Sequence, residues 1–191
     1  DFASCGYALC IVDTGGSHSD LTDEYAAVRK EMESVAEYLG KSVLREVDED
    51  EFMKNIADIR SSCGDRAVLR AMHFYGDNAR VEKQAAALKA GDFETFKKYI
   101  IESGRSSYMY NQNVYSCKKA SEQPVSLALS LSEKLLDGCG AWRVHGGGFA
   151  GTIQAFVPLN KLDEYKDLME KVFGSGSCYI LSVRPVGGVE L

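Results

Sequence analysis

Three consecutive glycines stand between two short apolar segments near the end of the chain, and this feature constrains the fold more than any other. The segments 142–145 and 152–157 are predicted to be strands. The turn between them contains Gly146, Gly147, Gly148, Phe149 and Gly151. Because glycine lacks a Cβ atom, such a turn can adopt positive φ angles and lets another backbone or a ligand approach closely. An ordinary hairpin needs fewer glycines, so a functional loop and a wide structural turn both remain open.

The rest of the sequence alternates between apolar strands and amphipathic helices. Residues 7–12 form a continuous apolar run that predicts a buried strand. Apolar side chains recur every three or four residues from Leu21 to Leu39, which predicts a helix capped by Asp20 or Thr22. Further helices are expected at 51–59, 65–91, 92–101, 124–136 and 162–173, a loop at 103–112 and a last strand at 178–183. Helices grouped between strands predict one α+β domain, with an antiparallel sheet covered by helices on one face.

Composition argues against several classes of protein. With 22 basic and 28 acidic residues the formal net charge is −6, and lysine and arginine form no cluster, so we expect no nucleic-acid partner. No apolar run approaches the roughly 20 residues of a membrane-spanning helix, and no signal peptide is recognisable, so we expect no membrane partner. The six cysteines lack Cys-x-x-Cys spacing. We therefore expect no zinc site, reduced and mostly buried thiols, and a cytoplasmic location.

A second segment, residues 12–30, supports the functional interpretation of the glycine turn. Together the two resemble the C-terminal half of galactokinases, members of the GHMP kinase superfamily, and the stretches 67–73, 85–93 and 102–106 extend the resemblance in order. The turn is similar to the third motif of that superfamily, with His145 in place of a threonine and Ala150 in place of a glycine. The resemblance implies a ferredoxin-like GHMP kinase C-terminal domain over 1–191, whose antiparallel sheet has about four strands. It also implies an N-terminal nucleotide-binding domain that this chain does not contain.

The resemblance further implies which residues form a site. Tyr25 matches a tyrosine that contacts the sugar in galactokinases, where a phenol offers an apolar ring and a polar hydroxyl; a core-facing Tyr25 is the alternative. His18 and Arg105 have counterparts in the family, and His145 beside the glycines could donate to a phosphate oxygen. A structural role is also open for each of these three residues. The acidic residues 48–51 stand at a predicted helix start, where negative charge favours a cap over a metal site.

By this resemblance, the full-length protein would transfer the γ-phosphoryl group of ATP to the C1 hydroxyl of galactose or a related hexose, with Mg²⁺ offsetting the phosphate charge. We expect no catalytic residue, metal ligand or bound cofactor in this chain, because the superfamily's nucleotide loop and the segment with the catalytic aspartate have no counterpart in it. The fragment alone is therefore expected to be inactive. Two rivals stay open: a catalytically inactive, galactose-responsive regulatory relative, and a stand-alone α+β ligand-binding module.

Overall fold

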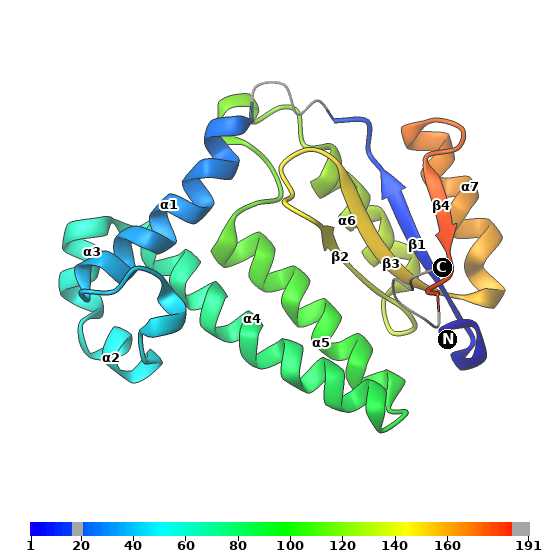
Figure 1. Ribbon diagram of the computed structural model, residues 1–191. Coiled ribbons are helices and arrows are strands. Elements are labelled where there is room, and N and C mark those ends of the chain that lie inside the picture. Colours follow the sequence, from blue (N-terminus) through cyan, green and yellow to red (C-terminus); the bar gives the residue numbers. More distant parts are fainter. Residues whose placement is uncertain (17–20, 185–191) are drawn as a thin grey trace, which may run out of the picture.

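One four-stranded antiparallel sheet organises the chain in the computed structural model, which describes residues 1–16 and 21–184 (Figure 1). The strands are β1 (Tyr7–Asp13), β2 (Ala141–His145), β3 (Thr152–Pro158) and β4 (Cys178–Leu181), in the spatial order β2-β3-β1-β4. Every neighbouring pair is antiparallel. Helices connect β1 to β2 and β3 to β4, whereas β2 and β3 follow each other directly, which is the ferredoxin-like arrangement. The predicted α+β fold is confirmed.

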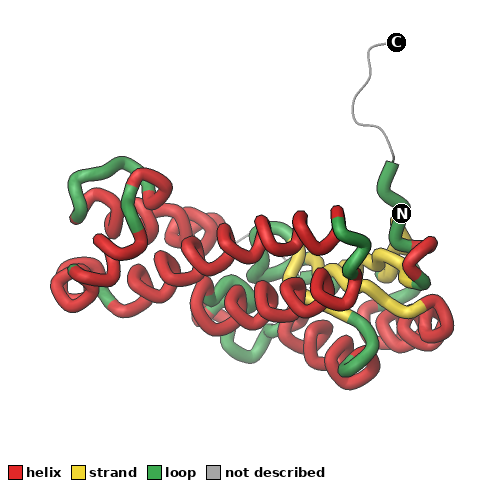
Figure 2. Tube along the Cα trace, turned by 90° about the horizontal axis from the view of Figure 1, so that it is seen from below, coloured by secondary structure: helices red, strands yellow, loops and turns green. Residues whose placement is uncertain are grey.

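Seven α-helices accompany the sheet within the described ranges: α1 (Thr22–Tyr38), α2 (Glu49–Lys54), α3 (Ile56–Cys63), α4 (Asp65–Lys89), α5 (Phe93–Ser106), α6 (Pro124–Leu136) and α7 (Leu162–Phe173). The first four form a helical extension that reaches away from the sheet (Figures 1 and 2). This extension has its own core, in which Val35 of α1, Phe52 of α2 and Ile59 of α3 are buried against Ala71 of α4. The long helix α4 therefore links the extension to the rest of the molecule.

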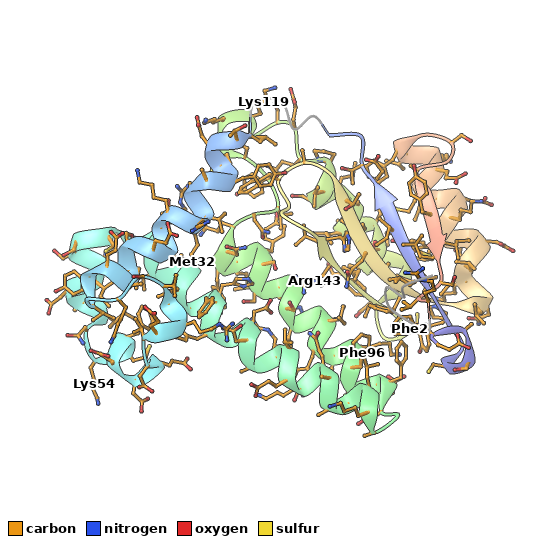
Figure 3. All side chains as sticks on the ribbon, in the orientation of Figure 1. Phe2, Met32, Lys54, Phe96, Lys119 and Arg143 are labelled. Carbon is orange, nitrogen blue, oxygen red and sulfur yellow. The ribbon has the colours of Figure 1, made fainter. Side chains whose placement is uncertain are left out.

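The two faces of the sheet are covered differently. α6 and α7 pack on one face, over the buried side chains of Cys10, Val12 and Ala155. α5 packs on the opposite face, most extensively against β2, and its Phe96 shares an apolar cluster with Phe156 of β3. Phe2 and Phe96 stack beside this cluster with ring centroids 6.1 Å apart (Figure 3). The structure thus adds a partial second helical layer to the single layer that the sequence predicts.

The predicted loop at 103–112 is wrong. α5 continues to Ser106, and a π-helical turn extends from Ser107 to Asn111. The hydroxyl of Ser103 donates to Asp77 of α4 at 2.6 Å, and Ser106 lies 2.9 Å from Nδ1 of His73. The polar residues of this segment therefore satisfy a buried network between α4 and α5 rather than marking a solvent-exposed loop.

Two helix boundaries also differ from the prediction. The helix expected at 51–59 is two helices that meet at Asn55. Asp48 caps the first of them and accepts hydrogen bonds from the backbone of Asp50 and Glu51, so the acidic run serves as a helix cap, as expected. α1 begins at Thr22 without a side-chain cap, and the alternative cap Asp20 lies outside the described residues.

All six cysteines are free thiols, as predicted, but most of them are not buried. Cys10 and Cys178 are buried, Cys5 and Cys117 are exposed, and the other two are partly buried. None of the described helices is long and apolar enough to cross a membrane.

His73 gives the fold a pH dependence. The residue is 8% exposed, and this burial lowers the pKa of its imidazole from 6.5 to about 4. The unfolded chain binds a proton at His73 below pH 6.5, whereas the folded chain does so only near pH 4, so stability falls as the pH falls through this window. The expected loss from this group is up to about 3 kcal/mol. Urea unfolding of the chain at several values between about pH 7 and about pH 4.5 measures this loss of unfolding free energy.

The control for this prediction is His73→Gln, which keeps a hydrogen-bonding side chain but does not titrate. The variant should lose most of the slope of unfolding free energy against pH in this range. An unchanged slope would show that other groups cause the acid sensitivity.

Candidate functional site

The glycine turn is a strained loop that connects β2 to β3. Gly146, Gly148 and Gly151 have φ angles of 69°, 83° and 143°, and the non-glycine Phe149 has a φ angle of 61°. A side chain at positive φ is unfavourable by about 1–2 kcal/mol, so the surroundings must hold Phe149 in place. Its ring is 2% exposed and packs edge-on against the ring of Tyr25, with centroids 5.2 Å apart. Burial of this one ring anchors the loop.

Tyr25, in the first turn of α1, supports the loop from one side. Its hydroxyl donates a hydrogen bond to the carbonyl oxygen of Gly148 at 2.8 Å. A Cβ atom at Gly147 would lie 2.7 Å from Cε1 of the Tyr25 ring, which explains why residue 147 has no side chain. Partial burial raises the pKa of Tyr25, so the phenol keeps the proton that it donates. The ring is half-buried, so part of it faces solvent beside the loop.

Asn113 holds the loop from the other side. Its carbonyl oxygen accepts a hydrogen bond from the backbone N–H of Phe149 at 2.6 Å, and its Nδ2 donates to the carbonyl of Gly147 at 3.2 Å. A Cβ atom at Gly148 would lie 1.8 Å from the Asn113 carbonyl oxygen, so only glycine fits there. Sequence reasoning missed Asn113, because an asparagine in a polar stretch carries no signal until the fold brings it to residue 148.

The segment after β1 completes the framework of the loop. The backbone N–H and the hydroxyl of Thr14 both donate to the carbonyl oxygen of Gly151, at 2.9 and 2.6 Å. A Cβ atom at Gly16 would lie 2.8 Å from the Cβ of Ala150. The methyl group that Ala150 introduces where the GHMP motif has glycine is therefore accommodated by the missing side chain at Gly16. The two segments that carry the resemblance are in direct contact.

A cavity of about 770 Å³ opens beside this framework. Its walls are Thr14, Gly15 and Gly16 after β1, the segment 116–124 before α6, and Phe149 and Ala150 of the loop. At the tip of the loop, Gly146 and Gly147 are exposed, and their backbone N–H groups donate to no acceptor among the described residues. Unoccupied backbone donors in a tight glycine turn suit an anionic group such as a phosphate.

The other three predicted site residues, His145, Arg105 and His18, do not all lie at the glycine loop. His145 is exposed at the end of β2, immediately before the loop, and its Nδ1 lies 2.9 Å from Oε1 of Gln154. Arg105 is exposed on α5 and lines a separate cavity of about 370 Å³ together with Trp142 and Glu133. The structure therefore brings His145 to the loop but not Arg105. His18 lies outside the described residues.

The described residues contain no group of three or more His, Cys, Asp and Glu side chains that could hold a metal ion. The arrangement offers backbone donors, an aromatic ring and a cavity, which together can position a ligand.

No protein-family model matches the chain. Curated relatives do match it: galactokinase of Homo sapiens is 31% identical over 184 residues, which are 96% of this chain and 44% of that protein. Galactokinase of Actinobacillus pleuropneumoniae serotype 5b is 26% identical over 164 residues, 86% of this chain and 41% of that protein. The chain thus spans less than half the length of these relatives.

A solved structure shares the fold. The crystal structure of Lactococcus lactis galactokinase complexed with galactose superposes with a TM-score of 0.67 and 21% identity, over 92% of this chain and 45% of that chain. Sequence relatives and fold agree, and the matched region is the C-terminal part of the relatives. The chain belongs to the galactokinase family.

Proposed function

We propose that this chain, as residues 1–191 of one domain, is the C-terminal part of a protein that transfers the γ-phosphoryl group of ATP to the C1 hydroxyl of galactose. The observation that carries the proposal is the loop at 146–151, held between Tyr25 and Asn113 with its exposed backbone donors left open. The similarity to galactokinases over most of the chain supports the same function.

The nucleotide and Mg²⁺ belong to the rest of the full-length protein in this proposal. The chain has no nucleotide loop, and its described residues form no metal site. We therefore assign to this chain only the positioning of the sugar and of the glycine loop. The free thiols are consistent with a cytoplasmic location, which is part of the proposal.

Tyr25 has two roles in this proposal. Its hydroxyl fixes the position of Gly148, and the solvent-facing part of its ring packs against the apolar face of the sugar. Support for this assignment comes from the place of Tyr25 beside the loop and from the family resemblance of residues 12–30. The same residue therefore links the sugar position to the shape of the loop.

The two roles of Tyr25 predict different effects for two variants of the full-length protein. Tyr25→Phe keeps the ring and loses one hydrogen bond, which costs about 0.5–1.5 kcal/mol of loop stability or binding. Tyr25→Ala loses ring and hydroxyl, so it should raise the galactose KM further than Tyr25→Phe, with the ATP KM nearly unchanged. Steady-state kinetics with each substrate varied in turn measures both. An unaltered galactose KM in Tyr25→Ala, with only a lower melting temperature, would make Tyr25 a purely structural residue.

Phosphorus NMR of the full-length protein with MgATP and galactose tests the proposed function. We expect a sugar 1-phosphate signal, and parallel reactions with N-acetylgalactosamine and other hexoses identify the preferred acceptor. Galactose binding without product would instead assign the regulatory role, and neither binding nor product would leave the stand-alone module.

A further inference from the structure

Residues 111–116, between α5 and α6, form a buried connector that starts in the π-helical turn and has no regular structure after it. Asn111, Asn113, Val114 and Ser116 are all buried, and Val114 belongs to the apolar core on the α6 face of the sheet. A buried irregular segment is unusual, because its backbone polar groups need partners that no regular ladder supplies. In Figure 1 the connector passes beside the turn between β2 and β3.

The start of the buried connector has an uncommon backbone. Gln112 follows the π-helical turn with a φ angle of 54°, in the left-handed region that a residue with a side chain seldom adopts. Its backbone N–H closes the turn on the carbonyl oxygen of Ser107 at 2.8 Å. Single π-helical turns and strained residues of this kind are frequent at functional sites. The next carbonyl is that of Asn113, which accepts the hydrogen bond from Phe149 in the glycine loop.

Arg70 holds the first end of the buried connector. Its side chain, on α4, is 1% exposed, and its Nε donates to the carbonyl oxygen of Asn111 at 3.0 Å. Nη1 of the same guanidinium lies 2.8 Å from Oε2 of Glu31 on α1. Because the guanidinium is planar and rigid, these two bonds fix Asn111 relative to both helices. The other end is held by Ser116, whose hydroxyl donates to Glu24 of α1 at 2.8 Å.

We propose that Arg70 is a positioning residue for the glycine loop and that it acts through the buried connector. Because α4 and α1 hold the two ends of the connector, the Asn113 carbonyl between them stays where the N–H of Phe149 meets it. Arg70 does not line the cavity beside the loop, so its effect on the site passes through Asn111 and Asn113. The inference rests on the proposed function, which assigns the positioning of the glycine loop to this chain.

Arg70→Lys in the full-length protein tests this role. Lysine keeps the positive charge beside Glu31, but its single ammonium group does not reproduce the two-sided guanidinium, so Asn111 loses its donor. We expect kcat and kcat/KM for galactose phosphorylation to fall equally, by about 10-fold, the equilibrium equivalent of one hydrogen bond from a charged group. Equal losses are the pattern of an interaction that counts in the transition state. Wild-type kcat in Arg70→Lys would overturn the proposal.

Val35→Ala is the control for general loss of stability. Val35 is fully buried in the core of the helical extension, and its truncation leaves the contacts of the connector intact. The variant should lower the melting temperature of the full-length protein, while kcat, measured well below that temperature, stays at the wild-type value. A loss of kcat as large as that of Arg70→Lys would show that destabilisation of the extension causes both effects.

A double substitution tests whether Arg70 acts through the connector. Gly148→Val forces the loop away from Asn113, because its Cβ would overlap with the Asn113 carbonyl oxygen. In that background Arg70 no longer has a loop to position, so adding Arg70→Lys should lower kcat by less than about twofold. If Arg70→Lys has its full effect in the Gly148→Val protein, the two residues act independently and the proposal is wrong.

Amide hydrogen exchange of the full-length protein gives a readout that does not need activity. Residues 147–151, which include the N–H of Phe149, should exchange several-fold faster in Arg70→Lys than in the wild type and at the wild-type rate in Val35→Ala. Arg70→Met, which has no charge to bury and also lacks the donor to Asn111, should show the same acceleration. Unchanged exchange in both Arg70 variants would overturn the positioning role. Faster exchange in a protein that does not phosphorylate galactose would overturn only the proposed function.

Discussion

Gly148→Val in the full-length protein is expected to lower kcat/KM for galactose phosphorylation by at least about 100-fold, the effect of misplacing a catalytic element by roughly an ångström. The reason is steric. A Cβ atom at residue 148 would lie 1.8 Å from the carbonyl oxygen of Asn113, and this oxygen belongs to the backbone, so no side-chain rotation relieves the clash. The loop must move away from Asn113 and lose the hydrogen bond from Phe149 to its carbonyl. Steady-state kinetics measures the loss.

The matched control is Gly91→Val, in the turn between α4 and α5. Gly91 has a φ angle of 70°, similar to the 83° of Gly148, but no atom lies within 4 Å of the position of its Cβ. Gly91→Val therefore introduces comparable backbone strain without the clash and away from the loop. It should lower the melting temperature while kcat/KM stays near the wild-type value. Wild-type turnover in Gly148→Val would show that the loop is only a surface turn.

Glu31→Ala should destabilise the chain by about 3–5 kcal/mol, the usual cost of removing one partner of a buried ion pair. The guanidinium of Arg70 on α4 has a side-chain exposure of 1% and lies 2.8 Å from the carboxylate of Glu31 on α1. Its Nε also donates to the carbonyl oxygen of Asn111 at 3.0 Å. Burial lowers the pKa of Arg70, whereas Glu31 favours its charged form. Without Glu31 a charged group would remain buried without its counter-ion. Urea unfolding monitored by circular dichroism measures the change.

Glu33→Ala, on the same helix, is the control. Glu33 pairs with Arg29, whose side chain is 82% exposed, and an exposed pair of this kind contributes little because solvent screens it. The two substitutions remove the same chemical group from α1. Glu31 also pairs with Arg66, but the Arg66 side chain is 44% exposed, so the buried Arg70 accounts for most of the expected difference. Equal unfolding midpoints for Glu31→Ala and Glu33→Ala would contradict the assignment of Arg70 as a buried charge.

The sheet and the main helices were predictable because they depend on local periodicity. The apolar run at 7–12 and the two segments beside the glycines become β1, β2 and β3, and α4, α6 and α7 lie close to their predicted ranges. The segment 103–112 was not predictable in the same way, since its serines look like loop residues until α4 supplies His73 and Asp77 as partners. Hydrogen bonds to α4, rather than local conformational preference, therefore determine the helical structure of segment 103–112.

The candidate site shows the same division. The sequence analysis named the glycines at 146–148 and Tyr25 as candidate site residues. In the structure the hydroxyl of Tyr25 contacts the glycine loop. Asn113 was not visible, because its role depends on a carbonyl position that only the folded chain creates. Arg105 was selected from the resemblance alone, and the fold places it in a different cavity. Residues that act through backbone contacts at long sequence separation are thus the ones that sequence reasoning misses.

The central claim is that this chain provides one wall of a two-part site and lacks the nucleotide-binding part. Isothermal titration of the chain with ATP and Mg²⁺, with the full-length protein as the positive control, tests this claim most directly. We expect saturable binding to the full-length protein and no saturable heat with the chain alone. Tight, stoichiometric binding of ATP to the chain would contradict the account.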